Sequence, residues 1–144
     1  MRSAAAKPGA NMADDPGYVL DSSALVALLA GEPGAEVVEA ALPNSILSAV
    51  NLAESMAKLI RRGGEAAEVE RLLRGLGLAI ETWTEELVWR SRDLCPLAWT
   101  KGLSFADRAC LALASATGRA ALTADRVWAS LGLPIRVQLI RGRR

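Results

Sequence analysis

The chain has 144 residues, 51% of them hydrophobic, and its 17 lysines and arginines against 16 aspartates and glutamates give a net charge of +1. This length and composition fit one globular domain with a sizeable core, and the near-zero charge argues against binding to nucleic acid by overall attraction. There is no histidine, and the two cysteines, Cys95 and Cys110, lack the spacing of a zinc site or a disulfide framework, so we expect both thiols to pack as small hydrophobic groups.

The first 17 residues differ in composition from the rest. They are rich in alanine, proline and glycine and carry Lys7, Asp14 and Asp15 in place of a continuous apolar stretch, so they form neither a signal peptide nor a membrane span. We interpret residues 1–17 as a disordered leader, a tag remnant or an early start with Met12 as the true beginning. The domain is then residues 18–144, and without a secretory signature we expect it in the cytoplasm.

From Tyr18 onward, short apolar runs alternate with helical patterns. Because strands separated by helices pair in parallel with right-handed crossovers, this alternation predicts an α/β fold, a three-layer α/β/α sandwich with a central, mainly parallel sheet. We expect strands at 18–21, 45–47, 76–82, 120–123 and 135–140, and helices at 23–30, 35–42, 49–62, 65–74, 85–94, 104–116 and 125–131.

Four acids stand at or beside junctions of these elements: Asp21, Glu54, Asp107 and Asp125. In parallel sheets ligands bind at the carboxyl ends of the strands, where all four side chains could meet. Clustered carboxylates resist ionising together unless a cation neutralises them, and Mg²⁺ or Mn²⁺ is the natural partner of an all-oxygen site. Such a cation orients a phosphodiester and lowers the pKa of an attacking water, which gives hydrolysis without a histidine base.

Each acid also has an ordinary structural explanation. Ser104 and Asp107 have the spacing of a capping box, and Asp125 fits an N-cap. Glu54 and Lys58 form a favourable i,i+4 pair. On that helix the polar arc of Asn51, Glu54, Ser55 and Lys58 lies opposite the apolar residues Leu52, Ala53, Met56, Leu59 and Ile60, which predicts a solvated polar face.

Four segments together resemble the PIN-domain family, and specifically its VapC-like toxins. The resemblance covers the chain from Tyr18 almost to its end, in the order of the family. The segments are Tyr18–Gly34 with YVLDSSALVALLAGEPG, Leu47–Glu54 with LSAVNLAE, Leu103–Ala114 with LSFADRACLALA, and Leu122–Asp125 with LTAD.

The resemblance implies a metal-dependent ribonuclease of a type II toxin–antitoxin pair, with RNA as substrate and a VapB-like antitoxin as inhibitor. Asp21 and Asp107 match the principal metal ligands of the family, and Glu54 and Asp125 match the acids that complete its pocket. Ser23 and Thr123 stand where the family often keeps small polar residues near the metal, although Ser23 would equally cap a helix.

Substrate binding and dimerisation complete this expectation. Arg108 and Arg126 stand beside two of the acids, where they would steer the RNA backbone or pair with neighbouring carboxylates. The family usually dimerises, and the apolar helices bordered by Trp83 and Trp89 could supply that surface, although core packing is the simpler interpretation of each tryptophan.

Other classes fit less well. A receiver-like phosphoacceptor domain resembles this chain poorly, because Asp14 and Asp15 precede the first strand instead of ending it. The third strand also ends without an acid, at Thr82 and Trp83, and the last strand is not followed by a lysine. A haloacid-dehalogenase-type phosphatase requires a second aspartate where Ser23 stands. A non-enzymatic PIN-like dimerisation or binding module with a degenerate site is the alternative that stays open, and the four intact acids argue against it.

Overall fold

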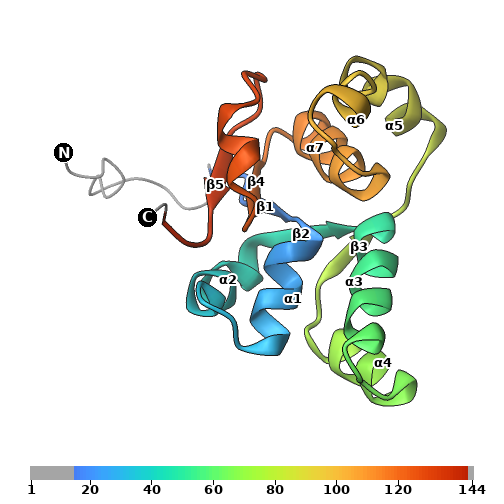
Figure 1. Cartoon of the computed structure of the whole chain (residues 1–144), viewed down its shortest axis with the longest axis vertical. Helices are drawn as coiled ribbons and strands as arrows, with labels where there is room; N and C mark the ends of the chain where they lie inside the picture. The colour runs from blue at the N-terminus through green and yellow to red at the C-terminus, as the bar shows by residue number, and fades with distance from the viewer. Residues whose placement is uncertain (1–14, 143–144) are drawn as a thin grey trace.

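The computed structural model describes residues 15–142, so the interpretation of residues 1–14 as a leader lies outside the described residues. A five-stranded, fully parallel sheet crosses the middle of the molecule (Figure 1). In the order β3-β2-β1-β4-β5, its strands are β1 (Tyr18–Leu20), β2 (Ser45–Ser48), β3 (Ala79–Glu81), β4 (Ala120–Thr123) and β5 (Val137–Leu139).

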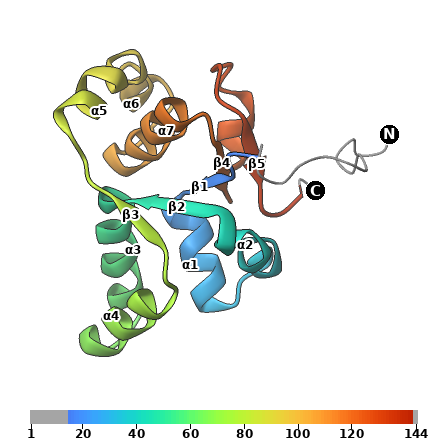
Figure 2. The ribbon, with the colours of Figure 1, turned by 180° about the vertical axis from the view of Figure 1, so that it is seen from behind.

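Helices cover the two faces of the sheet in separate groups, and the view from behind shows the same division (Figure 2). One face carries α1 (Ser22–Ala30), α2 (Ala35–Ala41), α3 (Ala49–Arg61) and α4 (Ala66–Gly75). The other carries α5 (Glu85–Arg90), α6 (Leu97–Thr100) and α7 (Phe105–Thr117). Short 3₁₀ helices occupy η3 (Leu42–Asn44), η4 (Ser91–Leu94) and η5 (Arg126–Ser130). The predicted three-layer sandwich is confirmed.

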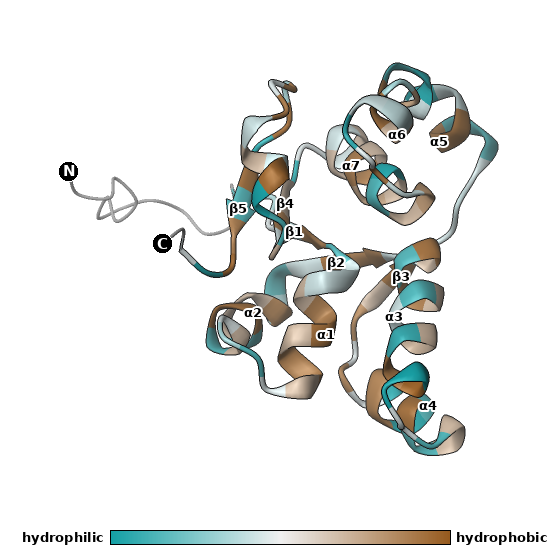
Figure 3. Ribbon diagram, viewed as in Figure 1, coloured by the Kyte–Doolittle hydropathy of each residue, from teal (hydrophilic) through white to brown (hydrophobic). Residues whose placement is uncertain are grey.

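Side-chain alternation on the central strand divides the core between the two layers. Val19 belongs to the cluster under α5 and α7, whereas Leu20 belongs to the cluster under α1 and α4, as the two-residue period of a strand requires. Both side chains are completely buried, as expected for a strand covered on both faces. Figure 3 shows the apolar residues along the strands and the inner sides of the helices. Asp21, directly after Leu20, is thereby held at the carboxyl edge of the sheet.

Some boundaries differ from the prediction. The helix expected at 85–94 changes to the 3₁₀ helix η4 where the Ser91 hydroxyl donates to the carbonyl oxygen of Val88, because a serine side chain competes for backbone groups. The short α6 was not predicted, and it follows Pro96, whose fixed φ suits a helix start. The segment 126–130 is 3₁₀ and not α-helical, and β3 and β5 are shorter than expected.

The prediction of a solvated polar face on α3 is wrong for two of its members. Asn51 and Ser55 are completely buried, while Met56 and Ile60 on the apolar arc are 37% and 38% exposed. The reason is tertiary for Asn51, which bonds to Ser22 of α1, while Ser55 donates to the Asn51 carbonyl oxygen within α3. The expectation that tryptophans pack in the core is also wrong for Trp89, which is 63% exposed.

The cysteines fulfil their expected packing role in part. Cys110 is completely buried in the cluster under α7, and Cys95 is half-buried. No helix within residues 15–142 combines the length and the apolar character needed to cross a bilayer.

Candidate active site

Asp21 is held in place by the two hydroxyl groups that the sequence singled out. Ser23 Oγ donates to Asp21 Oδ2 at 2.7 Å, and Thr123 Oγ1 donates to the same oxygen at 2.8 Å. The backbone N–H groups of Ala124 and Asp125 donate in turn to the Ser23 and Thr123 hydroxyl oxygens, at 2.9 and 3.0 Å. The end of β4 therefore fixes the orientation of the carboxylate after β1. Ser23 lies inside α1 and does not cap it, because Asp21 occupies the N-cap position.

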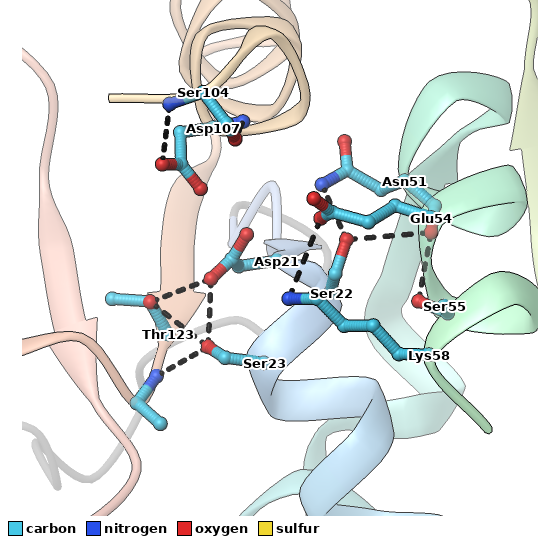
Figure 4. A network of polar contacts seen from close by, with 11 residues as sticks. Asp21, Ser22, Ser23, Asn51, Glu54, Ser55, Lys58, Ser104, Asp107 and Thr123 are labelled. Atoms are coloured by element: carbon cyan, nitrogen blue, oxygen red, sulfur yellow. Dashed lines mark hydrogen bonds and ion pairs between the residues drawn. The ribbon is translucent and has the colours of Figure 1, made fainter. Parts of the chain in front are cut away.

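The second oxygen of Asp21 has no hydrogen-bond partner within residues 15–142. The residue is 3% exposed, and Oδ1 is buried without a hydrogen bond among the described residues. Figure 4 shows this oxygen directed into the space between α7 and α3. Burial raises the pKa of Asp21 from 3.8 to about 6, against the opposing effect of the two hydroxyl donors, and the charge of Asp107 raises it further. Burying a charged oxygen that has no hydrogen-bond donor costs folding free energy, unless a cation binds that oxygen.

Asp107 has two roles because its carboxyl group is shared between a helix cap and the site. Its Oδ2 accepts from the Ser104 N–H at 2.8 Å, and its own N–H donates to Ser104 Oγ at 3.1 Å, which is the predicted capping box of α7. Burial raises the pKa of Asp107, and the charges of Glu54 and Asp125 add to this effect. The capping interpretation is confirmed, but it uses one oxygen only, and the carboxyl group still faces Asp21 (Figure 4).

Glu54 reaches the same space from α3 (Figure 4) and forms the predicted ion pair with Lys58, with Nζ and Oε1 3.8 Å apart. A buried polar network beside it was missed by the sequence reasoning. Asn51 Nδ2 donates to Ser22 Oγ at 3.0 Å, and Ser55 Oγ donates to the Asn51 carbonyl oxygen at 2.7 Å. Because Ser22 follows Asp21 directly, this network ties the first turn of α1 to α3. The signal for this network in the sequence was Asn51, a polar residue one turn before Glu54 in LSAVNLAE.

Asp125 caps η5, as its ordinary explanation predicted, since Val127 N–H donates to its Oδ1 at 3.0 Å. Its charge nevertheless raises the pKa of Asp107, so it lies at the same site. Arg108 stacks its guanidinium over the Phe105 ring, 6.0 Å from the centroid. Within residues 15–142 neither Arg108 nor Arg126 forms an ion pair, so their suggested pairing with carboxylates is not seen there.

The four acids thus converge without forming a closed cage. In the part of the chain that the structure describes, no three acidic or cysteine side chains are gathered tightly enough to enclose an ion as they stand. The charge of Asp107 raises the pKa of Asp21, and the charges of Glu54 and Asp125 raise the pKa of Asp107, each beside the larger effect of burial. The donor set is entirely oxygen, which suits a hard divalent cation.

Residues 18–132 match the family model of the PIN domain. The chain belongs to the PIN domain family. The match begins at the first residue of β1, includes all four acids and ends beyond η5. The PIN resemblance noted in the sequence is therefore confirmed.

Curated relatives resemble part of the chain. Ribonuclease VapC42 of Mycobacterium tuberculosis and VapC ribonuclease Mb2780c of Mycobacterium bovis are each 41% identical to it over 68 residues. This stretch is 44% of the chain and 52% of each relative, so the chain spans about half the length of the curated relatives it matches.

Solved structures resemble the PIN fold of nearly the whole chain. A toxin–antitoxin complex from Klebsiella pneumoniae has a TM-score of 0.67 at 20% identity, covering 87% of this chain and 98% of that one. VapBC2 from Rickettsia felis, bound to a fragment of promoter DNA, has a TM-score of 0.65 at 17% identity, with 85% and 97% covered. VapC20 of Mycobacterium tuberculosis, a toxin that cleaves the sarcin-ricin loop, has a TM-score of 0.65 at 20% identity, with 83% and 99% covered.

Proposed function

We propose that this protein is a Mg²⁺- or Mn²⁺-dependent endoribonuclease that acts as the toxin of a VapBC-type toxin–antitoxin pair in the cytoplasm. The observation that carries the proposal is the buried Asp21, whose one free oxygen points toward two further acids (Figure 4). Membership of the PIN family and the partial identity to VapC ribonucleases support the same activity.

The residues present fit a divalent cation. Asp21 Oδ1 is a buried oxygen without a hydrogen-bond donor in the described part of the chain, and burial and the charges of neighbouring acids raise the pKa values of Asp21 and Asp107. A cation removes both penalties at once. Asp21 and Asp107 would hold it, with Glu54 and Asp125 completing the acidic pocket. When bound, the cation supplies Lewis-acid stabilisation of a phosphodiester and lowers the pKa of an attacking water.

The chain itself supplies orientation and charge. Ser23 and Thr123 saturate Asp21 Oδ2, so that only Oδ1 is free to act. The buried network of Asn51 and Ser22 fixes α3 against α1, which keeps the Glu54 side chain on the same side as Asp21. Arg108 and Arg126 stand beside Asp107 and Asp125 and would bind phosphate groups of the RNA next to the scissile bond.

Cleavage of a mixed cellular RNA pool tests the proposal. Antitoxin-free protein is incubated with and without Mg²⁺ or Mn²⁺, beside Asp21→Asn and the matched variant Asp93→Asn, in which the altered side chain is 88% exposed. We expect cation-dependent cutting by wild type and Asp93→Asn and none by Asp21→Asn. If wild type is as inert as Asp21→Asn with both metals, the chain is better described as a binding module.

We also propose that an antitoxin covers the apolar groove between α3, α4 and β3. The groove has a volume of about 550 Å³, and Met56 and Ile80 in its lining are 37% and 42% exposed. Glu70 and Arg74 stand on its rim, so an amphipathic segment suits it. A Met56→Lys variant should lose antitoxin binding in a titration while keeping its nuclease activity.

A homodimer is proposed on a different face. Trp89 in α5 and Trp99 in α6 are 63% and 73% exposed. Exposed tryptophan side chains of this kind are typical of a protein–protein interface. Sedimentation of a Trp89→Glu, Trp99→Glu variant should show a monomer where wild type is dimeric. An unchanged mass would place the dimer elsewhere.

A further inference from the structure

A hollow lies at the carboxyl ends of β4 and β5, next to the segment that carries Asp125. It has a volume of about 310 Å³ and is lined by Ala124, Arg126, Arg141 and Gly142. Ala124 and Arg126 directly flank Asp125, so the hollow opens onto the segment that carries one of the four acids. The hollow lies at the same edge of the sheet as Asp21, because β4 runs parallel to β1 on one side and to β5 on the other.

The wall of the hollow is fixed by close contacts between the end of the chain and the turn after α1. Arg141 Nη1 donates to the Pro33 carbonyl oxygen at 2.6 Å. Gly34, with φ of +97°, approaches so closely that an added Cβ would lie 2.7 Å from the Ile140 carbonyl oxygen. Only glycine fits this approach. The contacts with Pro33 and Glu32 then place the Arg141 side chain against the turn after α1.

The charge around the hollow is positive. Glu32 accepts from Arg62 at 2.7 Å and lies 3.7 Å from Arg141, so one carboxylate is shared by two guanidinium groups and one positive charge remains. Arg126 adds a further exposed charge without an ion pair in the described residues. Four carboxylates repel an approaching polyanion, and the net charge of the whole chain is only +1. Positive side chains near the acids would offset this repulsion.

We infer that this hollow is a phosphate subsite, which holds a backbone phosphate of single-stranded RNA next to the scissile one through Arg126 and Arg141. The inference rests on the proposed ribonuclease function and deepens it. Guanidinium groups bind phosphate oxygens in a bidentate manner, and a contact of this kind positions the strand without reading its bases. The acids then act on a phosphodiester whose neighbour is already anchored.

Both strands offer matched controls, because each carries an arginine at either end. Arg119 precedes β4 and Arg136 precedes β5, at the opposite edge of the sheet, and each donates to a backbone carbonyl oxygen, of Asn44 and Gly118 respectively. Replacing Arg119 or Arg136 removes the same charge next to the same strands, but at the edge of the sheet away from the hollow. The test compares Arg126→Gln and Arg141→Gln with Arg119→Gln and Arg136→Gln, all in an Asp21→Asn background that prevents cutting.

The measurement is binding of a fluorescein-labelled single-stranded RNA of mixed sequence as a function of salt. Each lost phosphate contact should reduce the slope of log K against log salt by about 0.7 and weaken binding about fivefold at 0.1 M salt, or about 25-fold for the pair. The two controls should leave the slope unchanged. Arg141→Lys keeps the charge and should retain most of the slope, which separates loss of charge from damage to the wall.

The outcomes separate the subsite from the proposed function. If wild type cuts RNA but the Arg126 and Arg141 variants bind with an unchanged slope, the subsite is refuted and the nuclease stands. If wild type does not cut, yet RNA binding shows the expected slopes, the nuclease is refuted and the subsite stands. If an acidic peptide binds with this dependence and RNA does not, the hollow receives a protein segment and the RNA assignment is overturned.

Discussion

Replacing Asp21 by asparagine should stabilise the metal-free protein while it abolishes the proposed activity. Burial raises the pKa of Asp21 from 3.8 to about 6. Each pKa unit corresponds to about 1.4 kcal/mol, so the ionised carboxylate lowers the free energy of unfolding by up to about 3 kcal/mol at neutral pH. Asparagine carries no charge and keeps an oxygen for the Ser23 and Thr123 hydroxyl groups. A gain of about 1 to 3 kcal/mol is expected.

The pH dependence gives the sign of this effect. Because the pKa of Asp21 is higher in the folded than in the unfolded chain, its protonated form favours folding, and this contribution is complete below pH 3.8 and lost as the pH rises through about 6. The asparagine variant should therefore match wild type near pH 4 and exceed it increasingly toward pH 7. Asp107, whose pKa is also raised, contributes in the same direction to both proteins.

Urea unfolding in EDTA-containing buffer at pH 4, 5, 6 and 7 measures the difference. Asp93→Asn, at a side chain 88% exposed, should change the unfolding free energy by less than about 0.5 kcal/mol at any of these values. Added Mg²⁺ should stabilise wild type and Asp93→Asn, but not Asp21→Asn, by about 1.4 kcal/mol at ten times the dissociation constant. Equal stability of wild type and Asp21→Asn at pH 7, or a difference independent of pH, would refute the reasoning from burial.

Three further substitutions test the surroundings of the site. Thr123→Val removes a donor to Asp21 and leaves the Asp125 N–H without its acceptor, so it should weaken cation affinity roughly tenfold in an isothermal titration. Asn51→Leu breaks a completely buried network and should lower the unfolding free energy by about 2 to 4 kcal/mol in urea, whereas a change below 0.5 kcal/mol would mean that water replaces the amide. Ser104→Ala should cost about 1 kcal/mol in thermal unfolding through the lost cap of α7, with the RNA-cutting rate retained to within a few-fold.

Sequence patterns predicted the fold well where local and tertiary preferences agree. The alternation of apolar runs and helices gave the order of the strands along the chain, and Ser104 with Asp107 correctly marked the start of α7. The orientation of α3 was not predictable from its periodicity, since a polar arc is normally solvated. Here Asn51 bonds to Ser22 of α1, and Ser55 donates to the Asn51 carbonyl oxygen within α3. The bond between Asn51 and Ser22 joins residues 29 apart in the chain, beyond the reach of a helical pattern.

The sequence predicted which residues could form the candidate site, but it predicted the structural role of each residue only in part. Asp21 ended a Val-Leu strand and could be placed at the sheet edge from that position alone. The role of Ser23 could not be derived, because a serine after a strand fits a cap equally well until β4 is placed beside β1. Arg141 belongs to a basic run at the end of the sequence that is a candidate patch for nucleic acid, but its place could not be derived, since it depends on how the end of the chain meets the turn after α1.

The unequal positions of Asp21 and Asp107 bear on how other members of this family are judged. Asp107 starts a helix as well as facing the site, so a descendant that has lost its chemistry would still be under selection to keep this aspartate. Asp21 is expected to lower the stability of the cation-free fold because burial raises its pKa, so a chain without the proposed activity would gain stability by losing it. In a relative of this chain, the acid that follows the first strand should therefore indicate an active nuclease better than the aspartate of the SxxD helix start does.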